Sequence, residues 1–420
     1  MKILVVGSGG REHAISWKLK QSPRVTELYC APGNAGISQI AQCIAISAED
    51  LDGLLEFALK NEIDLTVVGP EVPLTMGIVD LFEKHQLKVF GPSQAAAEIE
   101  GSKAFSKDLM QKYHIPTAQY GVFTEVTKAN TFLETVSIPC VVKADGLAAG
   151  KGVLICESKE EASQAVEDIL VDNKFGSAGS RVVIEEFLIG QEVSMLAFTD
   201  GKTIRPMVSA QDHKRIFDGD QGLNTGGMGA YSPAPIYTGE VHNYVVDHVL
   251  QPTVEAMAAE GRTFAGVLYA GLMLTADGPK VLEFNARFGD PETQAILPRL
   301  QTDLVDIMLA VVEKRLDTQP IEWSEEACVC VVMASGGYPE SSEKGVPIKG
   351  LEDAAQKALV FHAGTAWQDK TIVTNGGRVL GISALGKDIA SAIDQAYQAV
   401  GQIQFTHMQY RTDIGKKALR

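Results

Sequence analysis

The chain has 420 residues, with 37 Lys and Arg against 53 Asp and Glu, which leaves a formal net charge of −16. Its composition, 45% hydrophobic and 21% charged, excludes a mainly disordered protein because there is enough apolar surface to build cores. The negative charge argues against nucleic acid or an anionic membrane as the main partner. We expect no membrane span, because the longest central apolar run, 264–274, falls short of the roughly 20 residues that a bilayer requires.

The cysteines and the amino terminus predict a cytoplasmic protein. No two of the six cysteines form a CxxC pair, and four of them lie in apolar, strand-like runs. We interpret them as reduced, buried thiols. The first apolar run, 3–6, is too short for a secretory signal and ends at Gly7.

The first hundred residues alternate between strand and helix patterns, which is typical of a parallel sheet with helices on both faces. The predicted strands are 3–6, 27–30, 43–46, 65–68 and 89–90. The predicted helices include 11–21, 51–60 and 78–85. We therefore expect an α/β unit at the start of the chain.

The regular alternation of strand and helix patterns ends near Gly91-Pro92. The next segment predicts an α+β unit with a largely antiparallel sheet. Its predicted strands are 140–142, 153–156, 182–185 and 193–198, and its helices are 103–113, 128–136 and 159–171. Strands return at 266–274 and 280–284, followed by a helix at 303–314 and a linker at 318–325. A final unit contains predicted strands at 329–333 and 381–385 and a helix at 389–400.

A glycine cluster, Gly7-Ser8-Gly9-Gly10, lies between the first strand and the first helix. Backbone N–H groups at a helix start suit a phosphate or a carboxylate. Glu12 stands where the dinucleotide fingerprint requires its third glycine, which disfavours a nicotinamide cofactor. Two interpretations stay open at this point: a tight strand-to-helix turn and an anion site.

A second cluster, 143–152, combines three glycines with Lys143 and Lys151 between two predicted strands. Lys143 extends an apolar strand, where a lysine is costly to desolvate unless it meets an anion. The spacing does not match a Walker loop. A phosphate-binding flap is favoured over an ordinary hairpin loop.

Polar residues stand at every second position from the end of the predicted strand 280–284 onward: Glu283, Asn285 and Arg287. Strand alternation predicts that Glu283 and Asn285 share one face, while Leu282 and Phe284 pack on the other. A carboxylate and an amide oxygen suit Mg²⁺, which also keeps substrate phosphates as ligands. The sequence therefore predicts a metal site at the end of this strand.

A polar, glycine-rich stretch at 211–229 contains Asp212, His213 and Lys214. A lone histidine is usually structural, but in a run this polar we predict a loop that contacts substrate. The chain contains neither a GxSxG nor an HExxH motif.

Together these residues resemble the ATP-grasp ligases, and within them the glycinamide ribonucleotide synthetases of purine biosynthesis. The most specific match is Arg287-Phe288-Gly289-Asp290-Pro291-Glu292-Thr293-Gln294, and the next is Asn224-Thr225-Gly226-Gly227-Met228-Gly229. One departure is Leu223, where the family usually has proline. The resemblance implies an ATP-grasp fold with an N-terminal parallel-sheet α/β domain (1–101), an ATP-grasp domain (102–326) with a mobile lid (about 121–189), and a C-terminal domain (327–420).

The resemblance also implies roles for individual residues. ATP binding is implied for Lys103, Lys143, Gly150, Glu185, Glu186, Leu188 and Glu192. Catalytic roles beside the reacting groups are implied for Asp212, Lys214 and Arg287. Metal ligation is implied for Glu283 and Asn285, and contact with a sugar phosphate for Gly9, Gly10 and Asp290.

The implied reaction joins glycine to 5-phosphoribosylamine through glycyl phosphate, with ATP as substrate and Mg²⁺ or Mn²⁺ as cofactor. We expect a monomer that binds these small molecules and contacts neighbouring purine-pathway enzymes at most transiently. One alternative is an ATP-grasp ligase that uses formate or bicarbonate, and the run 289–292 argues against it. The other is a nucleotide-binding regulatory protein without catalysis, against which the Glu283–Asn285 pair and the two lysines argue.

Overall fold

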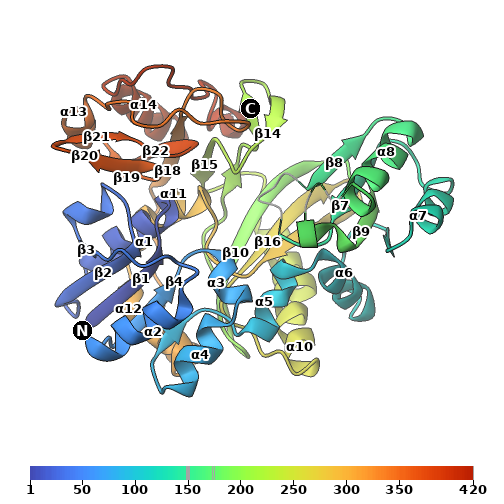
Figure 1. Ribbon diagram of the computed structural model, residues 1–420, viewed down its shortest axis with the longest axis horizontal. Helices are drawn as coiled ribbons and strands as arrows, with labels where there is room; N and C mark the ends of the chain where they lie inside the picture. Colours follow the sequence, from blue (N-terminus) through green and yellow to red (C-terminus); the bar gives the residue numbers. More distant parts are fainter. Residues whose placement is uncertain (148–151, 173, 175, 420) are drawn as a thin grey trace.

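A five-stranded parallel sheet forms the amino-terminal part of the computed structural model, as predicted (Figure 1). The structure describes residues 1–147, 152–172, 174 and 176–419. In spatial order the strands are β3 (Gln42–Cys43), β2 (Glu27–Pro32), β1 (Lys2–Gly7), β4 (Leu65–Val68) and β5 (Val89–Phe90). The helices of this part are α1 (Gly10–Lys20), α2 (Leu51–Lys60), α3 (Glu71–Thr75), α4 (Ile78–Lys84) and α5 (Gln94–Gly101).

Helices cover both faces of this sheet, which confirms the α/β prediction. Leu4 and Val6 of β1 belong to a core that includes residues of α2 and α4. Ile3 and Val5 belong to a second core with residues of α1 and of α12 (Leu304–Val312). This arrangement explains why β1 is apolar at nearly every position: its alternate side chains enter two different cores.

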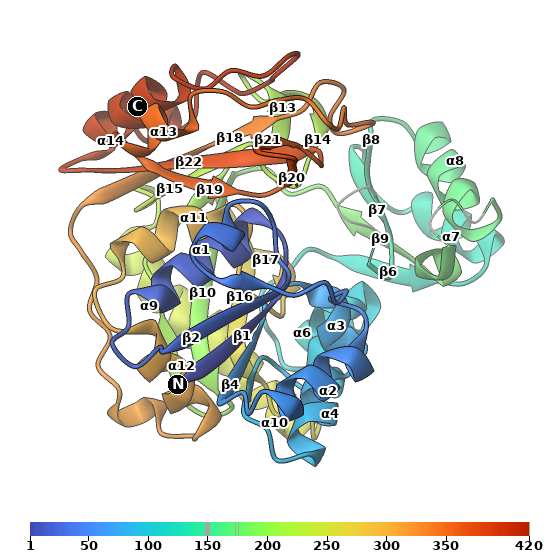
Figure 2. The same cartoon turned by 60° about the vertical axis from the view of Figure 1, so that its left-hand side comes forward.

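The middle of the chain forms two antiparallel sheets, in agreement with the predicted α+β unit. The larger sheet contains, in spatial order, β11 (Ile204–Pro206), β10 (Gln191–Asp200), β16 (Ala265–Thr275) and β17 (Gly278–Asn285). The smaller sheet contains β6 (Tyr120–Phe123), β9 (Val182–Glu186), β7 (Cys140–Ala144) and β8 (Val153–Cys156). With α7 (Val126–Leu133) and α8 (Lys159–Leu170) the smaller sheet has its own apolar core and projects to one side (Figures 1 and 2).

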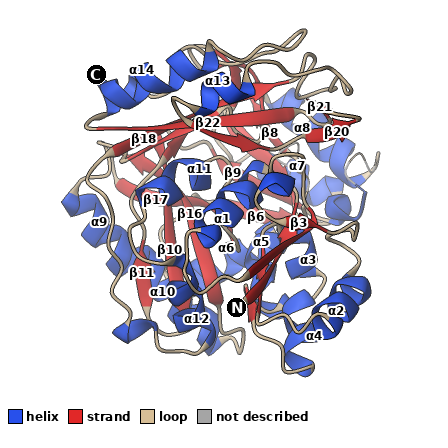
Figure 3. Cartoon of the chain, turned by 90° about the vertical axis from the view of Figure 1, so that its left-hand side faces the viewer, coloured by secondary structure: helices blue, strands red, loops and turns tan. Residues whose placement is uncertain are grey.

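Two strands from the middle of the chain complete the carboxy-terminal sheet. In spatial order this sheet contains β12 (Gln211–Asp212), β15 (Gly229–Ser232), β18 (Ala327–Ala334), β22 (Arg378–Gly386) and β19 (Leu359–His362). The helices α13 (Leu351–Ala355) and α14 (Ile389–Val400) lie over it, and β20 (Thr365–Gln368) pairs with β21 (Thr371–Thr374) beside it (Figure 3). β12 lies at the edge of this sheet, and Ala210, the residue before it, bridges to Ser194 of β10 in the middle of the chain.

The sequence prediction missed the helices α9 (Gly239–Val245) and α10 (Gln251–Ala259), which a π-helical turn at Val246–Leu250 joins. These helices contain several β-branched residues and Pro252, which have low helix propensity, and packing into the main core compensates for that. The short helices α6 (Lys103–Lys112) and α11 (Glu292–Ile296) border the site described below. Among the residues that the structure describes, no helix is long and apolar enough to span a membrane.

A buried arginine fastens the carboxy-terminal tail to the hairpin of β13 (Arg215–Phe217) and β14 (Gln221–Asn224). The side chain of Arg411 is fully buried and pairs with Asp220 at 2.9 Å and with Asp413 at 2.7 Å. It also donates to the Arg215 carbonyl at 3.1 Å. Because this hairpin follows Asp212 and Lys214, the tail supports one wall of the candidate site.

Replacing Arg411 by methionine should lower the free energy of unfolding by about 3 kcal/mol, because the Asp220 and Asp413 carboxylates and the Arg215 carbonyl lose a fully buried, charged donor. Urea unfolding followed by circular dichroism measures the effect. The matched control is Arg24→Met, which removes an exposed ion pair with Asp306 at 2.5 Å and should cost less than about 1 kcal/mol. Equal unfolding midpoints for the two variants would contradict the role given to Arg411.

Candidate active site

The end of β17 carries the predicted metal ligands, and a β-bulge changes the predicted alternation. Gly271 of β16 pairs with Glu283, but the next residue, Leu272, pairs with Val281, so Leu282 is an extra residue. The prediction that Leu282 packs beside Phe284 is therefore wrong. Phe284 enters the main core, whereas Leu282 packs in a small cluster with Ala118, Leu188 and Met273. Bulges of this kind reorient side chains next to functional sites.

Glu283 lies in an unusually cationic environment. Burial acts to raise the pKa of its carboxyl, but four nearby cationic groups outweigh burial and lower the pKa. These groups are Lys214, Lys143, Lys103 and Arg287. Glu283 is consequently ionised at neutral pH and offers hard carboxylate oxygens to a cation.

Arg287 is held in place by two acidic residues from the amino-terminal part. Its guanidinium pairs with Glu71 at 3.1 Å and with Glu100 at 2.9 Å, and it donates to Asn285 Oδ1 at 3.2 Å. Burial raises the pKa of Glu100, although the Arg287 charge opposes this, and Glu100 also accepts the Ala286 N–H at 2.7 Å. The orientation of the predicted ligand Asn285 thus depends on residues of α3 and α5.

One of the two predicted nucleotide lysines, Lys143, lies against Glu185 of β9. The carboxylate of Glu185 pairs with Lys143 at 2.8 Å and with Lys107 at 2.9 Å. Burial lowers the pKa of Lys107 to about 8, although the charge of Glu185 opposes this. Burial also lowers the pKa of Lys103, whose Nζ donates to the Gly146 carbonyl at 3.0 Å. Lys107 was not among the predicted site residues, because the polar sequence of its helix does not indicate that the side chain faces inward.

The remaining predicted nucleotide residues lie at the edge of this cluster. Leu188 belongs to the apolar group with Leu282, and the side chain of Glu186 pairs with Lys280 at 3.3 Å. Glu192 pairs with Lys214 at 3.0 Å. The predicted residue Gly150 lies outside the described residues.

The charges of Asp212 and Lys214 also act on the group around Glu283. Burial raises the pKa of Asp212 to about 7, an effect that the charge of Lys214 opposes and that of Glu292 reinforces. The carboxylate of Glu292 accepts from the Tyr269 hydroxyl at 2.8 Å and from the Ser194 hydroxyl at 3.1 Å. Glu292, Tyr269 and Ser194 are all buried and were not predicted as site residues.

Besides the charged site around Glu283, the structure has a pocket of about 260 Å³ between the glycine cluster and the carboxy-terminal sheet, here called the second pocket. From the first half of the chain it is lined by Ser8, Gly9, Gly33 and Asn34, and from the second half by Asp290, Ala363, Gly364, Thr365, Asn375 and Arg378. The pocket brings together Gly9 and Asp290, two of the residues for which contact with a sugar phosphate is predicted. Gly10 does not line this pocket, and a β-carbon there would lie 2.7 Å from Gln294 Nε2.

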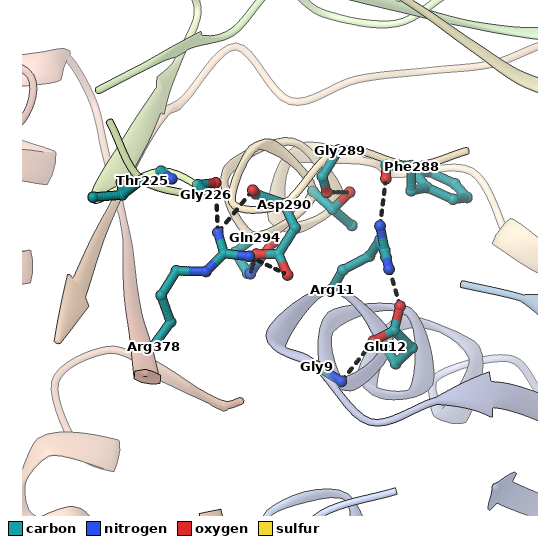
Figure 4. A network of polar contacts seen from close by, with 12 residues as sticks. Gly9, Arg11, Glu12, Thr225, Gly226, Phe288, Gly289, Asp290, Gln294 and Arg378 are labelled. Carbon is teal, nitrogen blue, oxygen red and sulfur yellow. Dashed lines mark hydrogen bonds and ion pairs between the residues drawn. The ribbon is translucent and has the colours of Figure 1, made fainter. Parts of the chain in front are cut away.

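Arg378 organises the pocket wall opposite Gly9 (Figure 4). It donates to the carbonyls of Gly226 at 2.7 Å and Asp290 at 2.9 Å, and pairs with the Asp290 carboxylate at 3.3 Å. Gln294 donates to the same carboxylate at 2.7 Å. Both specific motifs, 224–229 and 287–294, therefore meet at one carboxy-terminal arginine that no local sequence signal marks.

The donor set at the end of β17 fits a hard divalent cation. Glu283 and Asn285 could offer a carboxylate and an amide oxygen, and no cluster of three or more His, Cys, Asp or Glu within the described residues forms a closed metal site. Mg²⁺ commonly takes one or two protein ligands and completes its shell with water and substrate phosphates. The four surrounding cationic groups provide the positive field that a polyphosphate requires.

Comparison with known proteins places this geometry in a family. Three family models match the chain: phosphoribosylglycinamide synthetase N domain at residues 1–100, its ATP-grasp (A) domain at 101–293, and its C domain at 328–417. A phosphoribosylamine–glycine ligase of Halalkalibacterium halodurans is 54% identical over 421 residues, which cover 100% of this chain and 97% of that protein.

Solved structures show the same fold. The crystal structure of phosphoribosylamine–glycine ligase from Thermotoga maritima is 34% identical and matches with a TM-score of 0.86, covering 98% of this chain and 100% of that one. The biotin carboxylase domain of Hydrogenobacter thermophilus 2-oxoglutarate carboxylase, in complex with MgADP, ADP and bicarbonate, matches with a TM-score of 0.74. At 15% identity, with 97% of this chain and 91% of that one covered, it shows the fold alone.

The Asp212 carboxyl should titrate with a midpoint near pH 7 in the ligand-free protein. Carboxyl-carbon chemical shifts of aspartate-labelled protein measure the midpoint, and Asp212→Asn identifies the signal. Unfolding returns the group to its ordinary pKa of 3.8, so the native state loses stability as pH rises from about 4 to 7. Asp212→Asn should flatten that part of the stability profile, whereas an ordinary acidic midpoint would contradict the burial effect.

Proposed function

The chain belongs to the phosphoribosylglycinamide synthetase family, and we propose that it ligates glycine to 5-phosphoribosylamine with ATP, forming glycinamide ribonucleotide, ADP and phosphate. The observation that carries the proposal is the segment from Asn285 to Asp290. One end of it enters the cationic metal site, and the other lines the second pocket. A ligase that joins a phosphorylated acid to a sugar amine requires this adjacency.

The apolar cluster around Leu188 and the lysines Lys103 and Lys143 support a nucleotide site. Adenine would lie against Leu188, near the backbone of Glu185 and Glu186, and Glu192 would accept from the ribose hydroxyls. The side chains of Lys103 and Lys143 would bind the phosphates together with Gly150, which comes between β7 and β8 in the sequence. Lys103 and Lys143 exert charge on Glu283, which supports a phosphate position between them and the metal ligands.

Glu283 and Asn285 would hold Mg²⁺ or Mn²⁺, which supplies charge neutralisation at the transferred phosphoryl group. Among the residues of the chain, Arg287 orients Asn285 and adds positive charge beside the phosphates. A carboxylate oxygen of glycine would attack the γ-phosphorus, and ADP would leave. The resulting acyl phosphate has a good leaving group, which a free carboxylate lacks.

Asp212 and Lys214 would bind glycine between the phosphate site and Glu292. The Asp212 carboxylate suits the glycine ammonium, and Lys214 suits its carboxylate. The network of Tyr269, Ser194 and Glu292 supports this position because it is buried and carries an additional negative charge. The amine of phosphoribosylamine would reach the acyl carbon from the second pocket.

The second pocket would bind phosphoribosylamine. Asp290 offers a carboxylate for ribose hydroxyls, and Gly9 brings the backbone of the glycine cluster close to the ligand. Gly10 would act indirectly by allowing the cluster to approach Gln294. Thr365, Asn375 and Arg378 add polar groups from the carboxy-terminal sheet and its loops.

We further propose that the chain divides into domains at about 101 and 326, and that the unit at about 121–189 moves as a lid. The separate core of that unit supports its independent motion. We also propose a monomeric cytoplasmic enzyme that meets neighbouring purine-pathway enzymes at most transiently. Release of phosphate with glycine, formate or bicarbonate as the acid tests the reaction class. Activity with formate or bicarbonate alone would refute the glycine assignment.

Glu283→Gln and Asn285→Ala should each raise the Mg²⁺ concentration needed for activity and lower kcat by about 10²–10³, because a contact to the developing charge is lost. Rates measured against Mg²⁺ concentration, beside thermal melts, separate this effect from misfolding. The control is Asp277→Asn, an exposed carboxylate on the turn between β16 and β17, which should behave as wild type. Unchanged Mg²⁺ dependence in both variants would refute the metal assignment.

Glycine labelled with heavy oxygen in its carboxylate should transfer one labelled oxygen to inorganic phosphate in each turnover. The attacking oxygen bonds to the γ-phosphorus and leaves with the phosphate when the amine displaces it. Mass spectrometry of the phosphate measures the transfer. Label in AMP would indicate adenylation, and unlabelled phosphate with normal product formation would exclude glycyl phosphate.

A further inference from the structure

A series of buried polar contacts begins at Gly9, in the wall of the second pocket, and extends into the protein. The Gly9 N–H donates to Glu12 Oε2 at 2.6 Å, and Glu12 Oε1 accepts from Arg11 Nε at 2.5 Å (Figure 4). Arg11 is 7% exposed and Glu12 is 2% exposed, so solvent screens this ion pair little. Neither side chain lines the pocket.

The series continues through one backbone carbonyl to the metal site. Arg11 Nη1 donates to the Phe288 oxygen at 3.1 Å, and Arg287 Nη1 donates to the same oxygen at 3.2 Å. Arg287 also donates to Asn285 Oδ1 at 3.2 Å. The contacts from Gly9 to Asn285 thus form a continuous polar bridge between the second pocket and a proposed metal ligand.

The Glu12 side chain occupies space beside three glycines, where a β-carbon at any of the three would collide with it. A β-carbon at Gly7 would lie 2.5 Å from Glu12 Cγ, and one at Gly69 would lie 2.1 Å from Oε1. A β-carbon at Gly9 would lie 2.8 Å from Oε2. Much of the glycine cluster is therefore explained by the space that Glu12 needs, in the place where a dinucleotide site would have a third glycine.

We propose that Arg11 and Glu12 are positioning residues that couple occupancy of the phosphoribosylamine pocket to the metal end of the nucleotide site. This inference rests on the proposed function. A ribose phosphate against Gly9 orders the Gly9 N–H and thereby Glu12, Arg11 and the Phe288 carbonyl. The same carbonyl helps to orient Arg287, which orients Asn285. Coupling between two sites is reciprocal, so each ligand tightens the binding of the other.

Calorimetry on the full chain tests the coupling, with ribose 5-phosphate as a stable probe of the second pocket. The affinity for a non-hydrolysable ATP analogue with Mg²⁺ is measured with and without saturating ribose 5-phosphate. In the wild type we expect ribose 5-phosphate to tighten nucleotide binding about fivefold or more. Arg11→Met should remove this enhancement, because the Phe288 carbonyl loses one of its donors.

A milder variant keeps the test informative if Arg11→Met does not fold. Glu12→Gln keeps the shape and an acceptor for Gly9 but removes the charge that holds Arg11, so it should also lose the enhancement. It should raise the KM for phosphoribosylamine about tenfold, since a buried charge-assisted contact is weakened. Its affinity for the ATP analogue in the absence of ribose 5-phosphate should match that of the wild type, because the coupling acts only when both sites are occupied.

The matched control is Lys18→Met. Lys18 lies on the same helix and also donates to a distant backbone carbonyl, that of Leu300, at 2.5 Å, but it is not part of the polar bridge. This variant should keep the full enhancement, whatever its thermal stability. Equal enhancement in all variants would overturn the inference, as would its absence from a wild-type enzyme that turns over glycine. A wild type without glycine-dependent ADP formation would instead refute the proposed function.

Discussion

The arrangement of the site depends on the carbonyl oxygen of Phe288, because it accepts hydrogen bonds from two guanidinium groups, the buried one of Arg11 and the partly buried one of Arg287. Arg11 reaches it from the amino-terminal helix, and Arg287 reaches it from the end of the central sheet. Arg287 is in turn fixed by Glu71 and Glu100. A buried charge without a partner is costly, so these groups hold the two parts of the chain in one relative orientation.

Charge is distributed in the site so that a polyanion completes it. Glu283 stays ionised among four cationic groups, and the lysines around Glu185 exceed its single charge. Burial makes this excess of positive charge unfavourable in the free protein, as the lowered pKa values of Lys103 and Lys107 indicate. Phosphate groups would neutralise the excess positive charge of the lysines, and a divalent cation would pair with the Glu283 carboxylate. The site therefore favours a nucleotide with its metal over an uncharged ligand.

Some features of the site were predictable because short-range rules govern them. The alternation of apolar residues placed the parallel strands, and the two-residue spacing of Glu283 and Asn285 placed both residues at the end of β17. Leu282 was assigned to the wrong face because the bulge opposite Gly271 and Leu272 is a property of the pairing of two strands. A single strand's sequence does not encode which residue its partner leaves unpaired.

The sequence by itself determined the α/β start, the antiparallel middle, the two specific motifs and, through their resemblance, the family. Only the tertiary structure decided that Lys107 faces Glu185, that Arg378 joins the two motifs, and that Glu12 occupies the space left by three glycines. The reason is physical: periodicity reports which face of an element is apolar, whereas a buried polar group is specified by partners that are distant along the chain.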